Sequence, residues 1–185
     1  MATVAESRIA MRRNDSSVMF DRLFMEEYPK VVAIANRVLA DSHEAEDVAQ
    51  EVFCQYHRSY PPDAPFAAAW LHAAAAHSAL NVIRGKRRRL LRETLEATSR
   101  VRLTEDAEQA LNPEQALEVL ERRQEVQALL AKLPQRSAAV LALRYGGLSY
   151  AEIASALRIK PDQVGTLLRR AEAALRKEYG NGSRI

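Results

Sequence analysis

The chain has 185 residues, of which 48% are hydrophobic and 28% are charged, and its formal net charge is +3. This length suits one or two small domains with a real core. A single cysteine, Cys54, excludes an intrachain disulfide framework and favours the reducing cytoplasm as the compartment. No apolar run approaches the ~20 residues that span a bilayer, and there is no signal-peptide core, so we expect no membrane insertion.

The composition favours helices along the whole chain. Aromatic residues make up only 6%, alanine and leucine dominate, and the alternation of apolar and polar residues typical of strands is absent. We therefore predict an all-α protein with two small helical domains joined by a linker, the C-terminal one a helix-turn-helix. Residues 1–17 show no apolar period and are predicted to be a disordered leader.

The first predicted domain, residues 18–92, begins with two helices. Apolar residues recur at helical spacing over residues 18–39. Pro29 should kink or split this helix, because proline lacks an amide N–H. Asp41 offers an N-cap for the next helix. The acidic residues in the first turns of that helix suit the helix dipole, although such residues are common and often serve only solubility.

A proline-rich loop over residues 60–65 separates these two helices from a third. Its three prolines exclude a helix interior. The helix after the loop, roughly residues 66–92, ends in a basic block at residues 84–89. Such a dense block repels itself unless a polyanion lies opposite, and phosphate backbone is the usual partner.

Residues 93–112 are polar and lack a strong apolar period, so we predict a linker there. Fully extended, about 20 residues reach at most ~70 Å, which is the length of ~20 base pairs of duplex DNA. The second predicted domain, residues 113–185, opens with a helix from Pro113 to about Lys132.

The next three predicted helices begin and end at residues typical of a helix-turn-helix. Pro134 opens the first of them, and the glycines at 146–147 end it. Ser149 lies three residues before Glu152, the spacing of a capping box, and Pro161 suits the first position of the last helix. In this motif the last helix enters the major groove of DNA.

The outward face of that last helix is the predicted DNA-reading surface. Its apolar residues would pack on the earlier helices, which leaves these polar residues facing outward: Gln163, Thr166, Arg169 and Arg170. An ordinary helical hairpin with a solvated charged face fits the same pattern, because packing three helices needs no DNA.

This segment resembles the region of bacterial sigma factors that binds the promoter −35 element. The matching residues are Leu133-Pro134, Leu143-Arg144-Tyr145, Gly147-Leu148-Ser149-Tyr150, Glu152-Ile153-Ala154 and Arg170-Ala171. The resemblance implies −35 contacts by Ser149 together with the four outward residues. Gly165 and Leu167 replace positions that are usually basic in the family, which shifts the expected contacts toward Thr166, Arg169 and Arg170.

The first half resembles the other conserved region of the same family. Its acidic helix is similar to the segment that binds the polymerase clamp, which implies polymerase contacts by Glu46, Asp47, Gln50, Glu51 and Phe53. Trp70-Leu71, Ala79-Leu80-Asn81 and the basic tail are similar to the segment that opens and reads the −10 element. The implied DNA contacts are Tyr60, Phe66, His77, Asn81, Arg84, Lys86 and Arg87. The loop before Phe66 is shorter than in the family, and His77 stands where asparagine is frequent.

Both motif sets in this order, with only a linker between them, resemble the extracytoplasmic-function class of sigma factors. The resemblance implies a cytoplasmic factor that binds core RNA polymerase and promoter DNA and directs promoter recognition, DNA melting and initiation. It implies no enzymatic activity, no catalytic residues, no cofactor or metal and no small-molecule substrate. An anti-sigma protein is a candidate partner, with control by synthesis or by a kinase as alternatives.

Two other interpretations stay open at this stage. A stand-alone helix-turn-helix regulator would normally dimerise, and the sequence shows no apolar dimer stripe. A metal or redox enzyme could use Cys54 with His57, His72 and His77, but no cysteine pair, HExxH motif or glycine-rich phosphate loop accompanies them.

Overall fold

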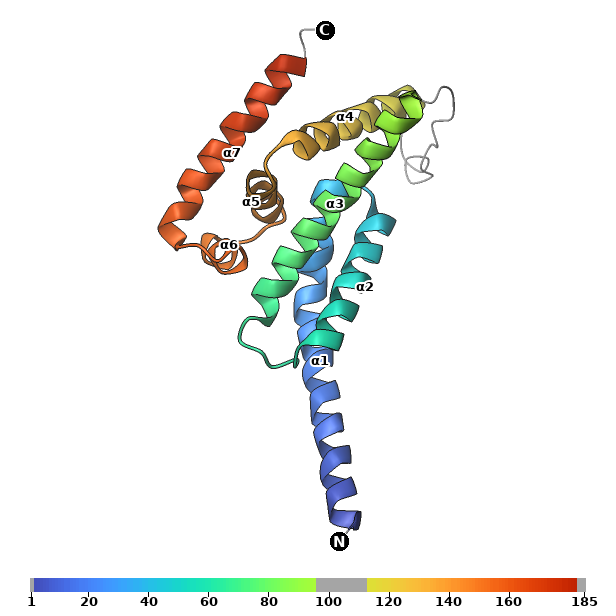
Figure 1. Cartoon of the computed structure of the whole chain (residues 1–185), viewed down its shortest axis with the longest axis vertical. Coiled ribbons are helices and arrows are strands. Elements are labelled where there is room, and N and C mark those ends of the chain that lie inside the picture. The colour runs from blue at the N-terminus through green and yellow to red at the C-terminus, as the bar shows by residue number, and fades with distance from the viewer. Residues whose placement is uncertain (1, 96–112, 183–185) are drawn as a thin grey trace.

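The computed structural model describes residues 2–95 and 113–182, which form seven helices and no strand. The first unit comprises α1 (Ala2–Leu39), α2 (Ser42–Ser59) and α3 (Ala67–Leu95). The second comprises α4 (Pro113–Lys132), α5 (Gln135–Tyr145), α6 (Tyr150–Leu157) and α7 (Pro161–Gly182) (Figure 1). The predicted all-α fold with two helical units is therefore confirmed. None of the described helices is long and apolar enough to cross a membrane.

The first unit is a three-helix bundle around an apolar interior. Ile34 and Val38 of α1, Val52 of α2, and Leu71 and Leu80 of α3 are at most 1% exposed. Each such burial contributes about 1.5–3 kcal/mol relative to an exposed side chain. This interior fixes the faces that α2 and α3 turn outward, and those faces carry most of the predicted binding residues of the first unit.

The first helix differs from the prediction in two respects. The structure extends α1 back to Ala2, so residues 2–17 of the predicted disordered leader, 1–17, are helical. No proline or glycine occurs between residues 2 and 28, so a helix anchored in the bundle can propagate toward the N-terminus. Nor is α1 split at Pro29, which lies on an exposed face where water can satisfy the carbonyl that loses its donor.

Helix ends lie where the local chemistry predicts them. Asp41 Oδ1 accepts a hydrogen bond from the Glu44 amide at 2.9 Å, which confirms the N-cap of α2. The Ser149 amide donates to Glu152 Oε2 at 2.8 Å, and the Glu152 amide donates to Ser149 Oγ at 3.3 Å. This capping box lowers the pKa of Glu152 to about 2. Pro161 is the first residue of α7, as predicted.

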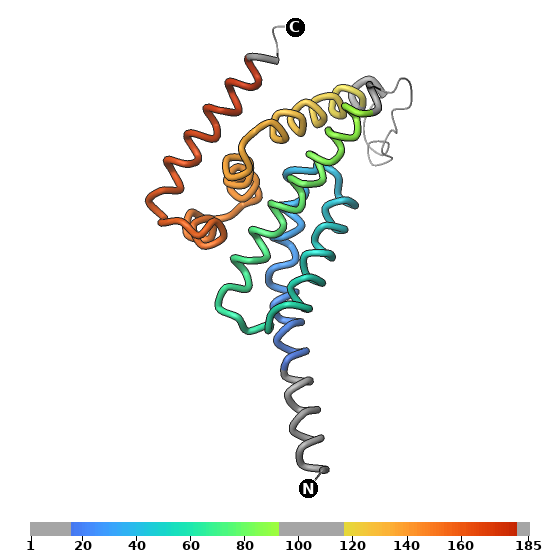
Figure 2. The backbone as a smooth tube through the Cα atoms, in the orientation of Figure 1, coloured from blue at the N-terminus to red at the C-terminus, as the bar shows by residue number. Residues whose placement is uncertain are grey.

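The two units pack against each other, which the sequence does not predict. Their buried residues form one continuous hydrophobic cluster. Helices α5 and α6 lie against α3, and the backbone trace shows the second unit folded back along the first (Figure 2). We expected separate lobes connected by a tether; the structure shows them closed on one another. The predicted linker, residues 93–112, lies almost wholly outside the described residues.

A buried polar pair links α1 to α3 inside the first unit. His72 Nε2 lies 2.7 Å from Glu27 Oε2, and the His72 side chain is 1% exposed. Its Nδ1 is buried and has no hydrogen-bond partner among the described residues. Burial lowers the pKa of His72, and this outweighs the opposing effect of Glu27. A protonated ring would place a second N–H where nothing accepts it.

We expect the protein to lose stability as the pH falls below the ordinary histidine pKa of about 6.5. In that pH range His72 is protonated in the unfolded chain but stays neutral in the folded chain. The stability that the protein has at higher pH is therefore lost on acidification. His72→Gln, which cannot titrate, should show a shallower fall in melting temperature between pH 7.5 and 5. His43→Gln, at an exposed position, is the control. Equal slopes for wild type and His72→Gln would contradict this assignment.

Candidate functional site

Four aromatic side chains gather where the loop after α2 meets the start of α3. The Tyr60 ring centroid lies 5.3 Å from that of Phe66 and 5.5 Å from those of Tyr56 and Trp70. Tyr56 is buried and donates its hydroxyl to the Pro61 carbonyl at 2.8 Å, which holds the loop in place. Tyr60 and Phe66 are 37% and 42% exposed, so both rings are accessible for stacking on bases.

A polar stripe continues along α3 from this aromatic cluster. His77, Asn81 and Arg84 are spaced four and three residues apart and therefore share a helical face, with Arg87 following at the next turn. Asn81 is exposed, and the other three are half-buried. Burial lowers the pKa of His77, and the charge of Arg84 lowers it further. The stripe therefore offers an amide, a neutral imidazole and guanidinium groups.

Lys86 does not belong to that stripe. Its Nζ lies 2.6 Å from both carboxylate oxygens of Glu44 on α2. This ion pair directs the Lys86 charge toward α2 and away from the face with Asn81 and Arg84. A DNA contact by Lys86 therefore requires the pair with Glu44 to break.

The outward face of α2 is acidic and polar. Glu46, Asp47, Gln50 and Glu51 are all exposed, and their spacing of three and four residues places them side by side. The structure thus brings together four of the five residues predicted to bind the polymerase.

Phe53, the fifth of these residues, does not lie on this exposed face, because its side chain is only 3% exposed. Its ring centroid lies 4.9 Å from that of Phe24, 5.9 Å from that of Tyr28 and 6.3 Å from that of Phe20. It shares a face of α2 with the buried Ala49 and Tyr56, four and three residues away, and therefore belongs to the interior of the bundle. Phe53 packs between α2 and α1 and offers no surface to a partner.

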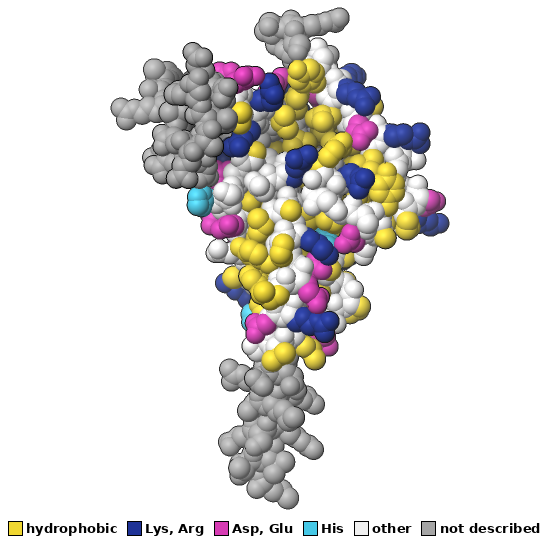
Figure 3. Space-filling view, turned by 180° about the vertical axis from the view of Figure 1, so that it is seen from behind, with side chains coloured by type: hydrophobic (Ala, Val, Ile, Leu, Met, Phe, Trp, Pro, Cys, Tyr) yellow, Lys and Arg dark blue, Asp and Glu magenta, His cyan; other side chains and the backbone are white. Residues whose placement is uncertain are grey.

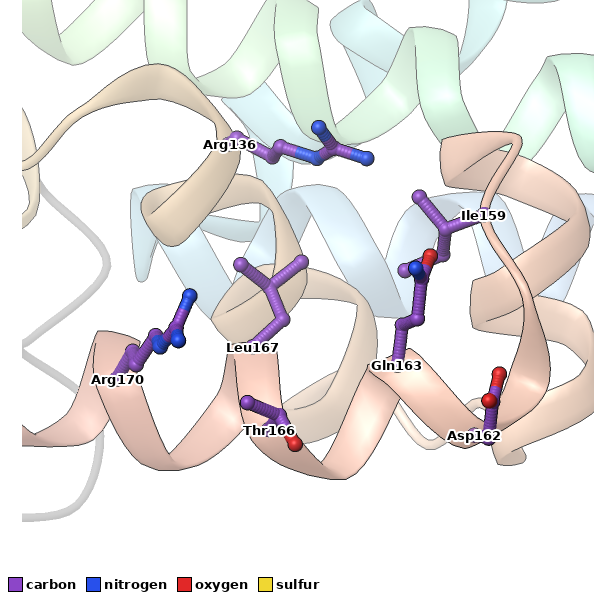
Figure 4. A pocket seen from close by; sticks show the side chains of 7 residues that line it. All are labelled: Arg136, Ile159, Asp162, Gln163, Thr166, Leu167 and Arg170. Carbon is purple, nitrogen blue, oxygen red and sulfur yellow. The ribbon is translucent and has the colours of Figure 1, made fainter.

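The predicted −35 surface forms one side of a shallow groove of about 420 Å³ (Figure 4). The groove is lined by Arg136, Ile159, Asp162, Gln163, Thr166, Leu167 and Arg170. Gln163, Thr166 and Arg170 recur at three and four residues along α7, so one face presents all three. Arg169 is exposed but lies outside the groove lining.

Sequence reasoning missed Arg136, which comes from the first turn of α5 and lies across the groove from α7 (Figure 4). Its exposure and positive charge match the outward residues of α7. In the sequence, Arg136 could be recognised only as a basic residue at the start of the helix after Pro134. Seen from behind the view of Figure 1, Lys and Arg side chains lie among exposed apolar ones (Figure 3).

Ser149, the remaining −35 candidate, is exposed at the start of α6. Its hydroxyl is already engaged, because Oγ lies 2.7 Å from Glu152 Oε2. Any contact of this residue with DNA would therefore compete with the capping box.

The residues considered for a metal or redox centre do not converge. Cys54 is exposed on α2, and the His57 ring lies against Phe20 with centroids 4.5 Å apart. Over residues 2–95 and 113–182, no group of three His, Cys, Asp or Glu side chains is placed to hold a metal ion.

Comparisons with known proteins assign the two units to two regions of one family. The family model of sigma-70 region 2 matches residues 23–89, and that of sigma-70 region 4 matches residues 123–175. The chain is 31% identical over 159 residues to the ECF RNA polymerase sigma factor SigE of Mycolicibacterium smegmatis. That match covers 85% of this chain and 60% of SigE.

Two other bacterial proteins match over most of their own length. SigW of Bacillus subtilis, an ECF RNA polymerase sigma factor, is 30% identical over 155 residues, 80% of this chain and 82% of SigW. The RNA polymerase sigma-H factor of Pseudomonas aeruginosa is 30% identical over 164 residues, 85% of this chain and 84% of that factor. The chain therefore belongs to the ECF class of the sigma-70 family of RNA polymerase sigma factors.

Proposed function

We propose that the chain binds core RNA polymerase and directs it to promoters, where it recognises the −35 and −10 elements and promotes DNA melting. The observation that carries this proposal is that sigma-70 regions 2 and 4 both match, in order, within one chain. The chain acts in transcription initiation and not as an enzyme. We infer that it works in the cytoplasm, with promoter DNA as its nucleic-acid partner and an anti-sigma protein as a candidate regulator.

For the −35 element, the proposed reading surface is the groove side of α7. Gln163 and Thr166 supply hydrogen-bonding groups for base edges, and Arg170 supplies a guanidinium for a guanine edge or a phosphate. Arg169 lies outside the groove and suits a flanking phosphate. Ser149 lies exposed at the start of α6 and would contact DNA by exchanging its bonds to Glu152, which engage both its amide and its hydroxyl.

For the −10 element, the aromatic cluster and the α3 stripe supply complementary chemistry. Exposed Tyr60 and Phe66 can stack on bases that leave the duplex. His77 and Asn81 offer hydrogen-bonding groups to base edges. The stripe cations for phosphates are Arg84 and Arg87, and Lys86 would join them only after its ion pair with Glu44 breaks.

For the polymerase, the proposed contact is the exposed acidic face of α2. Glu46, Asp47, Gln50 and Glu51 can pair with a basic surface, and such charge complementarity sets approach and register. We expect Asp47→Lys to weaken core binding about tenfold or more, equivalent to at least ~1.4 kcal/mol. The measurement is a titration of labelled protein with purified core enzyme.

Glu121→Lys is the matched control for this substitution. It makes the same change of charge at an exposed position on α4, away from α2. Equal losses of core binding in the two variants would show that net charge, and not the acidic face of α2, governs binding.

The function itself is tested by run-off transcription on genomic DNA with purified core enzyme and the purified chain. Promoter-specific transcripts that require both components are the expected result. A stand-alone regulator would bind DNA without supporting initiation by core enzyme, so transcripts absent under these conditions would exclude the proposed function.

A further inference from the structure

An ion pair joins the start of α2 to the second half of α3. Lys86 Nζ lies 2.6 Å from each carboxylate oxygen of Glu44. The Lys86 and Glu44 side chains are 48% and 31% exposed, so a partner molecule can reach both of them. An exposed ion pair of this kind is held weakly in water, and a competing charge can break it.

The helix start fixes the position of Glu44. Asp41 Oδ1 accepts a hydrogen bond from the Glu44 amide at 2.9 Å, and Glu44 is the third residue of α2. A carboxylate in the first turn is also stabilised by the helix dipole. Glu44 is therefore an anion at a fixed place. Lys86 has a flexible four-carbon stem, so it is the partner that moves when the pair breaks.

Glu44 lies at the edge of the acidic face of α2. Asp47 and Glu51 follow it by three and seven residues, so the three carboxylates share one side of the helix. Val48, four residues after Glu44, is only 8% exposed and packs into the bundle. Glu44 thus lies between the buried side of α2 and the carboxylates that we propose bind the polymerase. A cation of the polymerase that approaches Asp47 also comes near Glu44.

Lys86 lies next to the proposed DNA-binding stripe of α3. Arg87 follows it directly in the chain, and Arg84 precedes it by two residues. Pairing with Glu44 neutralises the Lys86 charge, so the free chain offers phosphate one cation fewer than the sequence of the basic block suggests. Once released, the Lys86 ammonium has three N–H donors for a phosphate beside Arg87.

Two cations therefore compete for Glu44. A basic group of the polymerase that pairs with Glu44 displaces Lys86 and also repels it, because both carry positive charge. A phosphate that binds Lys86 conversely leaves Glu44 open to the polymerase. Linkage requires the same factor in both directions. Exposed ion pairs change an equilibrium constant by up to about fivefold, which sets the size of the expected coupling.

We propose that Glu44 is a positioning residue that couples the polymerase surface of α2 to the DNA surface of α3. It holds Lys86 away from DNA in the free chain and releases it when a Lys or Arg side chain of core polymerase takes its place. The role given to the polymerase rests on the proposed function, whereas the hold of Glu44 on Lys86 does not. The complex with polymerase, and not the free chain, then presents the full positive charge of α3 to promoter phosphates.

The first test measures the affinity of labelled protein for purified core polymerase without DNA. Lys86→Gln frees Glu44 and is expected to tighten binding about two- to fivefold, although Lys86 lies on the DNA-binding helix. Arg88→Gln is the matched control, because it removes the same charge two residues further along α3 at an exposed position. In a Glu44→Gln background, Lys86→Gln should give no such gain, because its partner is already absent.

The second test needs no polymerase. It measures binding of the free chain, at low salt, to a labelled single-stranded oligonucleotide of about 12 nucleotides. Glu44→Gln releases Lys86 and should tighten binding about two- to fivefold. The slope of log affinity against log salt concentration should steepen by up to about 0.7, the value for one phosphate of a single strand. The gain should vanish in the double variant Glu44→Gln, Lys86→Gln.

Glu121→Gln controls for net charge in the second test, because it removes one carboxylate at an exposed position on α4. Equal oligonucleotide binding by Glu44→Gln and Glu121→Gln would show that Glu44 does not hold Lys86 away from DNA. Equal effects of Lys86→Gln and Arg88→Gln on core binding would likewise overturn the coupling. Failure of the wild type to bind core polymerase would instead count against the proposed function, and the oligonucleotide test would still decide whether Glu44 holds Lys86.

Discussion

Replacing Phe53 with alanine is expected to lower the free energy of unfolding by about 3–5 kcal/mol, the range found for truncating buried aromatic side chains. Phe53 is 3% exposed, and Phe20, Phe24 and Tyr28 surround its ring. Truncation would leave a cavity that three rings from another helix cannot fill without moving. Urea unfolding should show a lower midpoint with an unchanged slope.

The same residue distinguishes a structural role from a binding role. Phe53→Leu keeps most of the apolar volume and should lose less stability than Phe53→Ala. Folded Phe53→Leu should then bind core polymerase as the wild type does, because the side chain offers no surface to a partner. A Phe53→Ala protein with wild-type stability and defective core binding would show that the residue acts at the polymerase interface.

The parts of the fold that follow from short-range chemistry could be predicted from the sequence. Asp41 caps α2, Ser149 and Glu152 form the capping box of α6, and Pro161 begins α7. Each of these signals depends on residues within one helical turn, so no knowledge of the tertiary structure is needed. The exposed faces of α2 and α7 followed from helical periodicity for the same reason.

Features that depend on distant partners could not be predicted. Lys86 belongs to a basic block in the sequence, but its direction is set by Glu44 on another helix. The sequence indicates that Gly146 ends a helix, but its contact with Ile34 depends on how the first unit packs against the second. Phe53 was assigned to the polymerase contact because its segment resembles the one that binds the clamp, and only the packing of α1 shows which side chains cover its ring.

The closed arrangement belongs to the same class of unpredictable features. The inner faces of α3 and α5 are rich in alanine and leucine, and such faces pack equally well within one unit or between two. Periodicity shows that a face is buried but does not identify what covers it. The sequence therefore predicted two helical units correctly, whereas the expectation that they stay apart on a tether was wrong.

Replacing Arg170 with alanine is expected to reduce transcription from promoters that depend on the −35 element by about 5- to 150-fold, the equivalent of 1–3 kcal/mol. Arg170 faces the groove that Gln163 and Thr166 also line, with Arg136 opposite. The measurement is transcription by reconstituted holoenzyme from a promoter found by run-off mapping. Core polymerase binding should be unaffected, because Arg170 is exposed on α7, which packs against α4, α5 and α6, whereas the acidic face belongs to α2.

Two comparisons decide what Arg170 does. Arg176→Ala makes the same substitution at an exposed position on α7 outside the groove lining, and should change transcription little. If Arg170 contacts a base, Arg170→Ala should relax the sequence preference at one position of the promoter. If it contacts a phosphate, binding should weaken equally on all sequences, and the slope of log affinity against log salt concentration should fall in magnitude by about one. Equal effects of the Arg170 and Arg176 substitutions would show that general charge, and not the groove, governs binding to the −35 element.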